Sequence, residues 1–384
     1  MNNNDYNFQD QNGQKEEIKF DDRDFANPYS RYYRPQNQNG FGADFKVDEE
    51  PSYTPPSLIN EEKEKRNFTR IGVGYALLAV ITNVVALILC LIVKYTDPIF
   101  YQSTLFLNIV TPASIYLFAL PVLLIVISKC EAKPPKKKKL GFGAFLICLI
   151  TAFGFMYLGS IVGNYVMELI SESVGHDYSN GLTSIIDYDN LWITAIFTVI
   201  VAPIGEEFVF RKLLIDRTQK YGGFVSIGLS GLMFGLMHGN LYQFFYCFAL
   251  GLLLGYIYYS TGKLYLTIAI HAIVNFVGSV VSPLLIPVAE ALDSLDLTDT
   301  EGIFSFVEAN LWLVLALAAF SLFTYVAMAC GVIFPIAFRK KLKLGKGELE
   351  LPGAKIMPIV IMNYGVIAML IVYLFEFGMN LLPI

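Results

Sequence analysis

Residues 191–215 read LWITAIFTVIVAPIGEEFVFRKLLI, an apolar run with two adjacent glutamates in its second half. A run of roughly 20 apolar residues is about what a helix needs to cross the hydrocarbon core of a bilayer. An ionisable side chain at membrane depth is costly, so it marks a functional site by default. This segment therefore predicts a transmembrane helix that carries part of a functional site.

Similar apolar runs recur along the 384-residue chain. They lie near residues 71–94, 103–129, 140–167, 191–215, 224–238, 241–260, 264–288, 305–337 and 356–379. The chain is 55% apolar and 16% charged, whereas ordinary globular domains are about one quarter charged. We predict an all-α fold, a polytopic transmembrane helix bundle of about nine spans.

The first 67 residues differ from the rest in composition. Residues 1–67 are rich in Asn, Gln, Asp and Tyr and show no apolar periodicity. Such a segment cannot bury enough apolar surface to fold alone, so we predict a disordered cytoplasmic tail. The tyrosines and arginines of residues 29–34 could dock a cytoplasmic partner, although a solvated linker is the simpler interpretation. The membrane domain would then span residues 68–384, with its catalytic core at about 190–290.

The loops between the apolar runs alternate in charge. One set carries lysines and arginines, as at residues 129–139 and 339–343, and the other carries aspartates, as at 177–189 and 293–301. By the positive-inside rule the basic loops are cytoplasmic. We therefore predict a multi-pass cell-membrane protein with a cytoplasmic N-terminus and an extracytoplasmic C-terminus. The Lys136–Lys139 run is interpreted as a topology signal that touches anionic lipid, so the bilayer and not nucleic acid is the expected partner.

Polar residues interrupt three of the apolar runs. They are Glu206, Glu207 and Arg211 in the first run, Phe234 and His238 in the second, and His271 and Asn275 in the third. The chain has three histidines, and two of them lie in these apolar runs. Because three separate runs each carry side chains of hydrolytic type, the set predicts one catalytic site more strongly than any member does alone.

The spacing within the motifs assigns different tasks to the two glutamates. Glu207 and Arg211 are four residues apart, so they share a helix face and can form an ion pair in the favoured order. Glu206 points about 100° away around the helix. We therefore predict that Glu207 and Arg211 form a structural clamp and that Glu206 is free to act as a general acid or base. His271 and Asn275 also share a face.

Each of these residues also has a purely structural interpretation. A Glu–Arg pair in a membrane can simply hold helices together, and a single histidine or asparagine often bridges helices by a hydrogen bond. Two other functions therefore stay open. One is a non-enzymatic membrane scaffold or bacteriocin-immunity-type protein, and the other is a cation or proton transporter. A transporter would more naturally show internal repeats or several acids along a pathway, but Glu376 is the main further acid inside an apolar run.

The elements EExxxR, FxxxH and HxxxN, in this order on successive runs, resemble the motifs of the CPBP family of intramembrane proteases. This family groups the type II CAAX prenyl endopeptidases with bacteriocin-processing (Abi) proteins. The resemblance covers roughly residues 190–290. It implies an intramembrane endopeptidase with a polar cavity that opens toward the cytoplasm. Such an enzyme would cleave near the C-terminus or a membrane-proximal part of a peptide or protein, with prenylated CAAX ends and leader peptides both open as substrates.

The resemblance also implies a role for each motif residue. Glu206 and His238 would activate a water molecule, and His271 with Asn275 would stabilise the tetrahedral oxyanion. Family members are described as metalloproteases, and a metal-free glutamate mechanism has also been argued. One divalent metal, with zinc the first candidate, would be held by Glu206, His238 and His271. The same groups could equally hold a water molecule without a metal.

Overall fold

The computed structural model describes residues 59–176, 178, 190–296, 298–340, 342, 344–349, 351 and 353–382. Within these residues the regular secondary structure is entirely helical. Seven helices in this part of the chain are long and apolar enough to cross a membrane: Glu61–Thr96, Thr104–Ile127, Phe142–Val174, Leu191–Tyr221, Leu241–Thr261, Leu264–Asp293 and Leu311–Ala337. Two shorter apolar helices, Gly223–Met237 and Tyr364–Asn380, match the two remaining runs. The prediction of an all-α polytopic bundle is confirmed.

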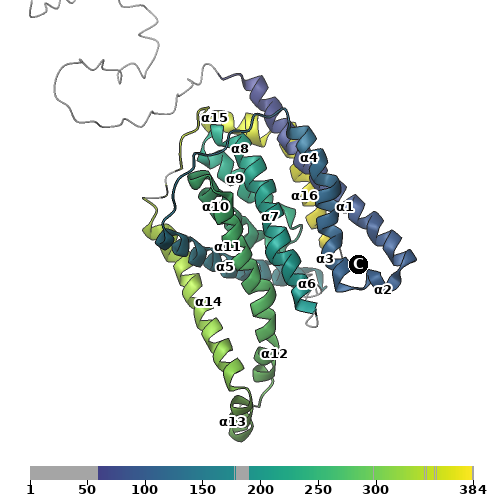
Figure 1. The fold of residues 1–384 in the computed structure, drawn as a ribbon, viewed down its shortest axis with the longest axis vertical. Helices are drawn as coiled ribbons and strands as arrows, with labels where there is room; N and C mark the ends of the chain where they lie inside the picture. The colour runs from purple at the N-terminus through teal and green to yellow at the C-terminus, as the bar shows by residue number, and fades with distance from the viewer. Residues whose placement is uncertain are drawn as a thin grey trace, which may run out of the picture. The chain divides into compact units, whose positions relative to one another are not determined.

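Three of the seven long helices in the described residues, Thr104–Ile127, Leu191–Tyr221 and Leu264–Asp293, are assembled from several helical segments that follow one another (Figure 1). The α-helices are α1 (Glu61–Thr96), α2 (Pro98–Tyr101), α3 (Thr104–Ala113), α4 (Leu120–Ile127), α5 (Phe142–Val174), α6 (Leu191–Ala195), α7 (Ala202–Glu207), α8 (Leu214–Thr218), α9 (Gly223–Met237), α10 (Leu241–Thr261), α11 (Leu264–Phe276), α12 (Ser282–Asp293), α13 (Thr300–Ala309), α14 (Leu311–Ala337), α15 (Gly353–Ile356) and α16 (Tyr364–Asn380). Wider π-helical turns lie at η3 (Ser114–Ala119), η6 (Ile196–Val201), η7 (Phe208–Leu213), η9 (Val277–Val281) and η10 (Met357–Ile361), and a tighter 3₁₀ turn lies at η8 (Gln219–Tyr221).

Proline explains the position of three of the π-helical turns. The segments η3, η6 and η9 each end two residues before a proline, namely Pro121, Pro203 and Pro283. Proline has no backbone N–H, and its ring clashes with the carbonyl one turn earlier, so the preceding turn widens. Single π-helical turns of this kind are frequent at functional sites. One of them directly precedes α7, which carries both glutamates.

The start of the first span corrects the predicted tail boundary. Residues 1–58, which make up most of the predicted disordered tail, lie outside the described part of the chain. Residues 61–67, however, form the first turns of α1. The side chain of Asn60 accepts a hydrogen bond from the N–H of Lys63, and Glu61, Glu62 and Glu64 occupy the first turn, where negative charge favours a helix. The apolar pattern alone missed these residues because they are polar, although they suit a helix start.

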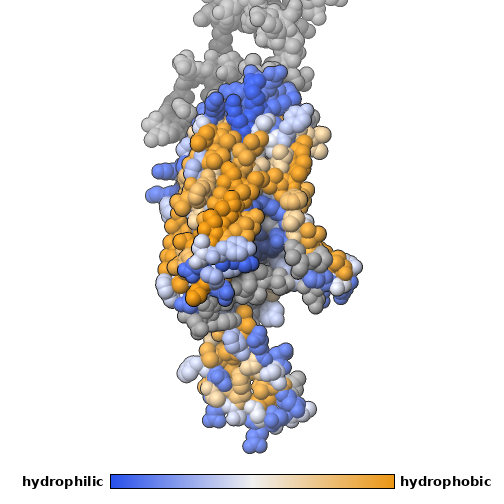
Figure 2. Space-filling model, turned by 90° about the vertical axis from the view of Figure 1, so that its right-hand side faces the viewer, coloured by the Kyte–Doolittle hydropathy of each residue, from blue (hydrophilic) through white to orange (hydrophobic). Residues whose placement is uncertain are grey.

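The outer surface matches a lipid environment. Figure 2 shows a broad band of hydrophobic residues on one face, with hydrophilic residues beyond it. Large apolar side chains on several spans are exposed, including Leu117, Ile125 and Leu322. Apolar patches of this extent are unusual on soluble proteins and indicate a surface that lipid covers.

The basic loops lie together at one end of the bundle. The backbone N–H of Lys133 donates to the carbonyl of Asp216 at 2.7 Å, and the N–H of Leu349 donates to the carbonyl of Lys220 at 2.7 Å. The side chains of Lys133 and Glu348 also form an ion pair. The basic loop at 129–139 and the segment that follows α14 are therefore both joined to residues 216–220 and to each other.

The helices α1 and α16 cross at two glycines. A Cβ atom added to Gly72 would lie 2.2 Å from the carbonyl carbon of Gly365, so only glycine permits this approach. Next to the crossing, the side-chain amide of Asn363 donates to the carbonyl of Lys65 at 2.8 Å. The crossing fixes α16 against α1, and further along the chain both helices line the cavity described below.

Candidate active site

The predicted ion pair between Glu207 and Arg211 is present and sealed from solvent. The Nε atom of Arg211 lies 3.1 Å from Oε2 of Glu207, and both side chains are 0% exposed. The guanidinium carbon lies 4.4 Å from the ring centroid of Phe234. Within the described residues, the guanidinium nitrogens make no hydrogen bond of good geometry. Arg211 is therefore held mainly by charge attraction to Glu207 and by the face of an aromatic ring.

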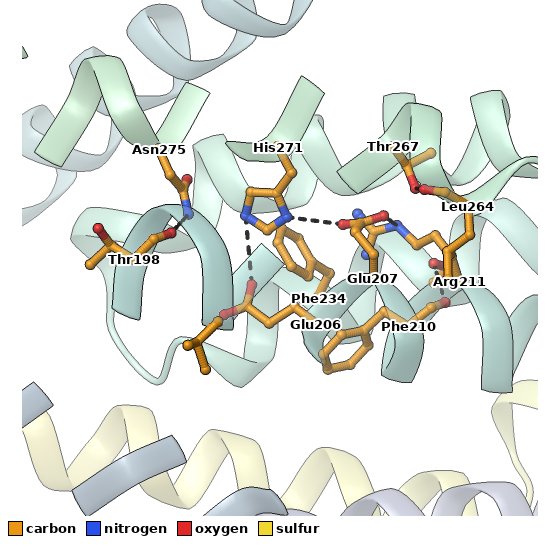
Figure 3. Close-up of polar contacts among 12 residues, drawn as sticks. Thr198, Glu206, Glu207, Phe210, Arg211, Phe234, Leu264, Thr267, His271 and Asn275 are labelled. Carbon is orange, nitrogen blue, oxygen red and sulfur yellow. Dashed lines mark hydrogen bonds and ion pairs between the residues drawn. The ribbon is translucent and has the colours of Figure 1, made fainter. Parts of the chain in front are cut away.

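His271 lies between the two glutamates (Figure 3). Its Nδ1 atom is 3.0 Å from Oε1 of Glu207, and its Nε2 atom is 3.7 Å from Oε2 of Glu206. A carboxylate can only accept a hydrogen bond, so Nδ1 carries the proton that goes to Glu207. Nε2 is then directed toward Glu206. The sequence motifs placed His271 beside Asn275 as oxyanion support, whereas the structure brings it directly against both carboxylates.

His238 approaches the site from the end of α9. Its Nδ1 atom lies 2.9 Å from the carbonyl oxygen of Phe234, so Nδ1 donates and Nε2 is left as an acceptor in the neutral ring. The ring of Phe234 contacts His238 at 5.2 Å and His271 at 5.5 Å between centroids, edge to face in both cases. Phe234 therefore packs against His238, one helical turn away. This one ring also contacts His271 and Arg211, which the spacing of the motif did not indicate.

Asn275 has a structural task in the described contacts. Its side-chain amide donates to the carbonyl oxygen of Thr198 at 2.8 Å, as Figure 3 shows. In the π-helical turn η6, the N–H of Ala202 bonds to the carbonyl of Phe197, so the carbonyl of Thr198 would next await the N–H of residue 203. Residue 203 is proline and has none. Asn275 thus supplies the hydrogen bond that Pro203 cannot give, and its role in oxyanion stabilisation stays a prediction.

A cavity of about 900 Å³ reaches Glu206 and His238. Its other walls come from α1, from the segment around Thr111 and Ile115, and from α16. Glu207, Arg211 and His271 do not line it. Of the motif residues, Glu206 and His238 therefore reach the cavity, and Glu207, Arg211 and His271 lie behind them.

Sequence reasoning missed two residues of this cavity. Asn83 on α1 and Asn380 on α16 both line it, together with Glu376. Asn83 donates from Nδ2 to Oε1 of Glu376 at 2.6 Å. Glu376 was noted only as an isolated acid, and a single asparagine in an apolar run carries no motif. Asn83 and Asn380 are polar residues inside apolar runs, and this is the feature of the sequence that could have identified them.

The hydrogen bonds of the two predicted histidine ligands suit a zinc site, but the positions of the three predicted ligands do not. His271 and His238 each donate from Nδ1 to a carboxylate or carbonyl oxygen, the arrangement usual for histidines that bind a metal through Nε2. Among the described residues, however, no group of three or more His, Cys, Asp or Glu side chains is arranged to hold a metal ion. As they stand in this structure, Glu206, His238 and His271 do not form a ligand set.

Comparison with known proteins bears on the same segment. Residues 188–277 match the family model described as Type II CAAX prenyl endopeptidase Rce1-like. This segment is therefore similar to the family that the three motifs resemble. A protein of Bacillus subtilis (strain 168), named "Putative membrane peptidase YdiL", is 31% identical over 81 residues, which are 21% of this chain and 33% of that protein. The chain thus matches about a third of the length of this curated relative. No solved structure matches the chain significantly.

The matched segment contains all three of the helices that carry the motif residues. The match includes α7 with both glutamates, α9 with Phe234, and α11 with His271 and Asn275. It does not include α1 or α16, which form much of the cavity wall. The family match therefore covers the polar cluster and leaves the opposite wall to be interpreted from its own residues.

Proposed function

We propose that this chain is an intramembrane endopeptidase of the CPBP family, whose nucleophile is a water molecule activated by Glu206 and His238. One observation carries the proposal. Glu206, with an 18% exposed side chain, and His238 line the same cavity, while the groups that orient them are buried behind. The family match and the name of the Bacillus subtilis relative support the same reaction class.

The reaction follows from the protonation states that the hydrogen bonds of His238 and His271 favour. The Glu206 carboxylate takes a proton from water, and the water oxygen forms a bond to the carbonyl carbon of the peptide. Nε2 of His238 accepts the second O–H of that water and so orients it. When the C–N bond breaks, the proton held by Glu206 passes to the leaving amine. His271 is fixed by Glu207 through Nδ1, and its Nε2 atom faces Glu206, where it can accept a hydrogen bond from that carboxyl group once the group has taken the proton.

The direct test is proteolysis by the purified full chain in detergent or nanodiscs. Substrates should include CAAX peptides with and without a prenyl group, leader peptides and the tails of membrane proteins. We expect new peptide termini, detected by mass spectrometry, for at least one of these classes. Absence of cleavage for every class at enzyme excess would count against an endopeptidase.

Metal dependence is a separate expectation. The described acid and histidine side chains are not arranged around one point as metal ligands would be. The proposed reaction therefore uses Glu206, His238 and water. We expect turnover to change by less than about twofold after treatment with a strong chelator, whereas loss of a catalytic zinc would remove most activity. Metal analysis of the same sample is the accompanying measurement. If the chelator abolished activity and added zinc restored it, Glu206, His238 and His271 would bind a zinc ion in the active enzyme.

We also infer the orientation in the membrane. The joined basic loops mark the cytoplasmic end by the positive-inside rule, so the N-terminus faces the cytoplasm and the end of α16 faces outward. Alkaline phosphatase fused after residue 384 should therefore be active in a bacterial host, because that reporter works only outside the cytoplasm. A fusion placed after residue 139 is the matched control and should be inactive. The reverse pattern would invert this topology.

A further inference from the structure

We propose that the wall of the cavity formed by α1 and α16 is a binding subsite for a positively charged side chain of the substrate, with the carboxylate of Glu376 as its acceptor. This inference rests on the proposed function, since it concerns the peptide that the cavity receives. It assigns a role to residues outside the segment 188–277 that the family model covers.

Glu376 lacks a countercharge. It lines the cavity together with Glu206 and His238, and its described partner is the neutral amide of Asn83, at 2.6 Å. No lysine or arginine of the described residues forms an ion pair with it. Acids inside membrane proteins usually pair with a base or mark the path of a ligand. Without an internal base, the pairing group is left for a ligand to provide.

The charge of the whole cavity points the same way. Its lining contains two acids, Glu206 and Glu376, and one histidine, but no lysine or arginine. Arg211 lies on the same helical span as Glu206, but it is fully buried against Glu207 and Phe234. In surroundings of low dielectric constant, charge interactions are strong. Such a cavity favours a cationic group over a carboxylate such as the free end of a peptide.

Two hydroxyl groups add unused hydrogen-bonding capacity to this wall. Thr82 and Tyr373 both line the cavity, and neither hydroxyl has a hydrogen-bond partner in the described part of the chain. Tyr373 is only 1% exposed, so its polar atom is left without a partner inside the protein. Buried polar groups normally have a partner, and one without needs an explanation. A ligand in the cavity would provide one.

A lysine side chain matches the chemistry of this wall. Its ammonium group has three donors, which carboxylate and hydroxyl oxygens can accept. Its aliphatic stem can lie along apolar surface while the charged end reaches polar atoms. The same wall offers that surface through Val84, Leu87 and Ile371. A lysine near the cleaved bond of the substrate is therefore the ligand that we expect.

The competing interpretation is that Asn83 and Glu376 only tie α1 to α16. The substitution Glu376→Gln separates the two interpretations, because glutamine keeps an oxygen that can accept from Asn83 but removes the charge. A purely interhelical role predicts little dependence on the charge of the substrate. A subsite predicts a change in specificity.

The experiment uses peptides that differ at one position, carrying lysine, norleucine or glutamate, with this position scanned across the cleaved bond. The readout is the ratio of kcat/KM for the lysine and norleucine peptides. At one position we expect the unmodified chain to prefer lysine by about tenfold or more, as for a close charge pair from which water is largely excluded. In Glu376→Gln the ratio should fall to about one. Glu308→Gln, an exposed acid on α13 outside the cavity, is the matched control and should keep the preference.

A second variant, Asn83→Lys, tests the same subsite if Glu376→Gln does not fold. Asn83→Lys places a cation on α1 beside Glu376 and should likewise abolish the preference for lysine. If turnover is absent or too slow, the same peptides are labelled with a fluorophore and their binding to Glu206→Gln is measured. The ratio of the dissociation constants for the norleucine and lysine peptides then gives the preference directly.

The outcomes separate the two proposals. Cleavage without any preference for lysine, or a preference that survives in both Glu376→Gln and Asn83→Lys, would overturn the subsite and leave the endopeptidase intact. Absence of cleavage with a tenfold binding preference would remove the reaction but keep the cationic subsite. Absence of both would overturn both.

Discussion

Glu206→Gln is expected to lower kcat/KM for peptide cleavage by about 10²–10⁴-fold, the contribution that general acid–base catalysis typically makes. The amide of glutamine cannot take a proton from water, although it occupies nearly the same volume. His238→Gln should also reduce turnover, because the cavity then lacks the acceptor that orients the water. Initial rates on a quenched fluorescent peptide measure both effects.

The matched control is Glu168→Gln, which removes an exposed acid on α5 outside the cavity. It should keep full turnover. Size-exclusion chromatography and thermal unfolding in detergent establish that each variant is folded. Normal turnover in both Glu206→Gln and His238→Gln would rule out the proposed reaction. A membrane scaffold predicts a different outcome: the unmodified chain shows no protease activity, and the variants lose assembly or stability.

Arg211→Met is expected to destabilise the protein by about 3–5 kcal/mol, because it leaves a buried carboxylate without its countercharge. Both side chains of this pair are 0% exposed, so water cannot replace the lost interaction. The change also removes the guanidinium from the face of Phe234, the ring that contacts both histidines. Chemical or thermal unfolding in mixed micelles measures the loss.

Arg66→Met provides the comparison for this variant. Arg66 lies 3.4 Å from Glu62 with the same four-residue spacing, but the two side chains are 60% and 84% exposed. Exposed pairs contribute about 0–1 kcal/mol, so its effect should be small. The double variant Glu207→Gln/Arg211→Met should recover part of the stability, since neither charge is then left alone. Equal stability of Arg211→Met and the unmodified chain would show that this pair is no clamp.

The part of the site that sequence predicted well is local. The pairing of Glu207 with Arg211 follows from their spacing on one helix, and the structure shows it. The assignment of Glu206 to the free role follows from the same geometry, and Glu206 does reach the cavity. The helical class was equally accessible, because apolar length alone implies a helix in a bilayer.

The part that sequence could not predict depends on contacts between distant residues. Asn83 and Glu376 are 293 positions apart, so no spacing rule connects them. The hydrogen bond from Asn275 to Thr198 depends on the π-helical turn before Pro203, and apolar periodicity does not reveal such turns. Likewise, the placement of His271 between Glu206 and Glu207 is set by the packing of α11 against α7. A motif shows which side chains are available, while packing decides which atoms they face.

The π-helical turns on either side of α7 also bear on how this sequence can change in evolution. A π-helical turn holds more residues than an α-helical one. Deleting one residue from Ile196–Val201 would therefore restore a regular helix and turn the preceding residues by about 100° relative to Glu206. The carbonyl that now meets Asn275 would move away with them. A shift in length is thus a large change to the backbone here. Apart from Pro203, Glu206, Glu207 and Arg211, residues 196–213 should tolerate new side chains more readily than a single insertion or deletion.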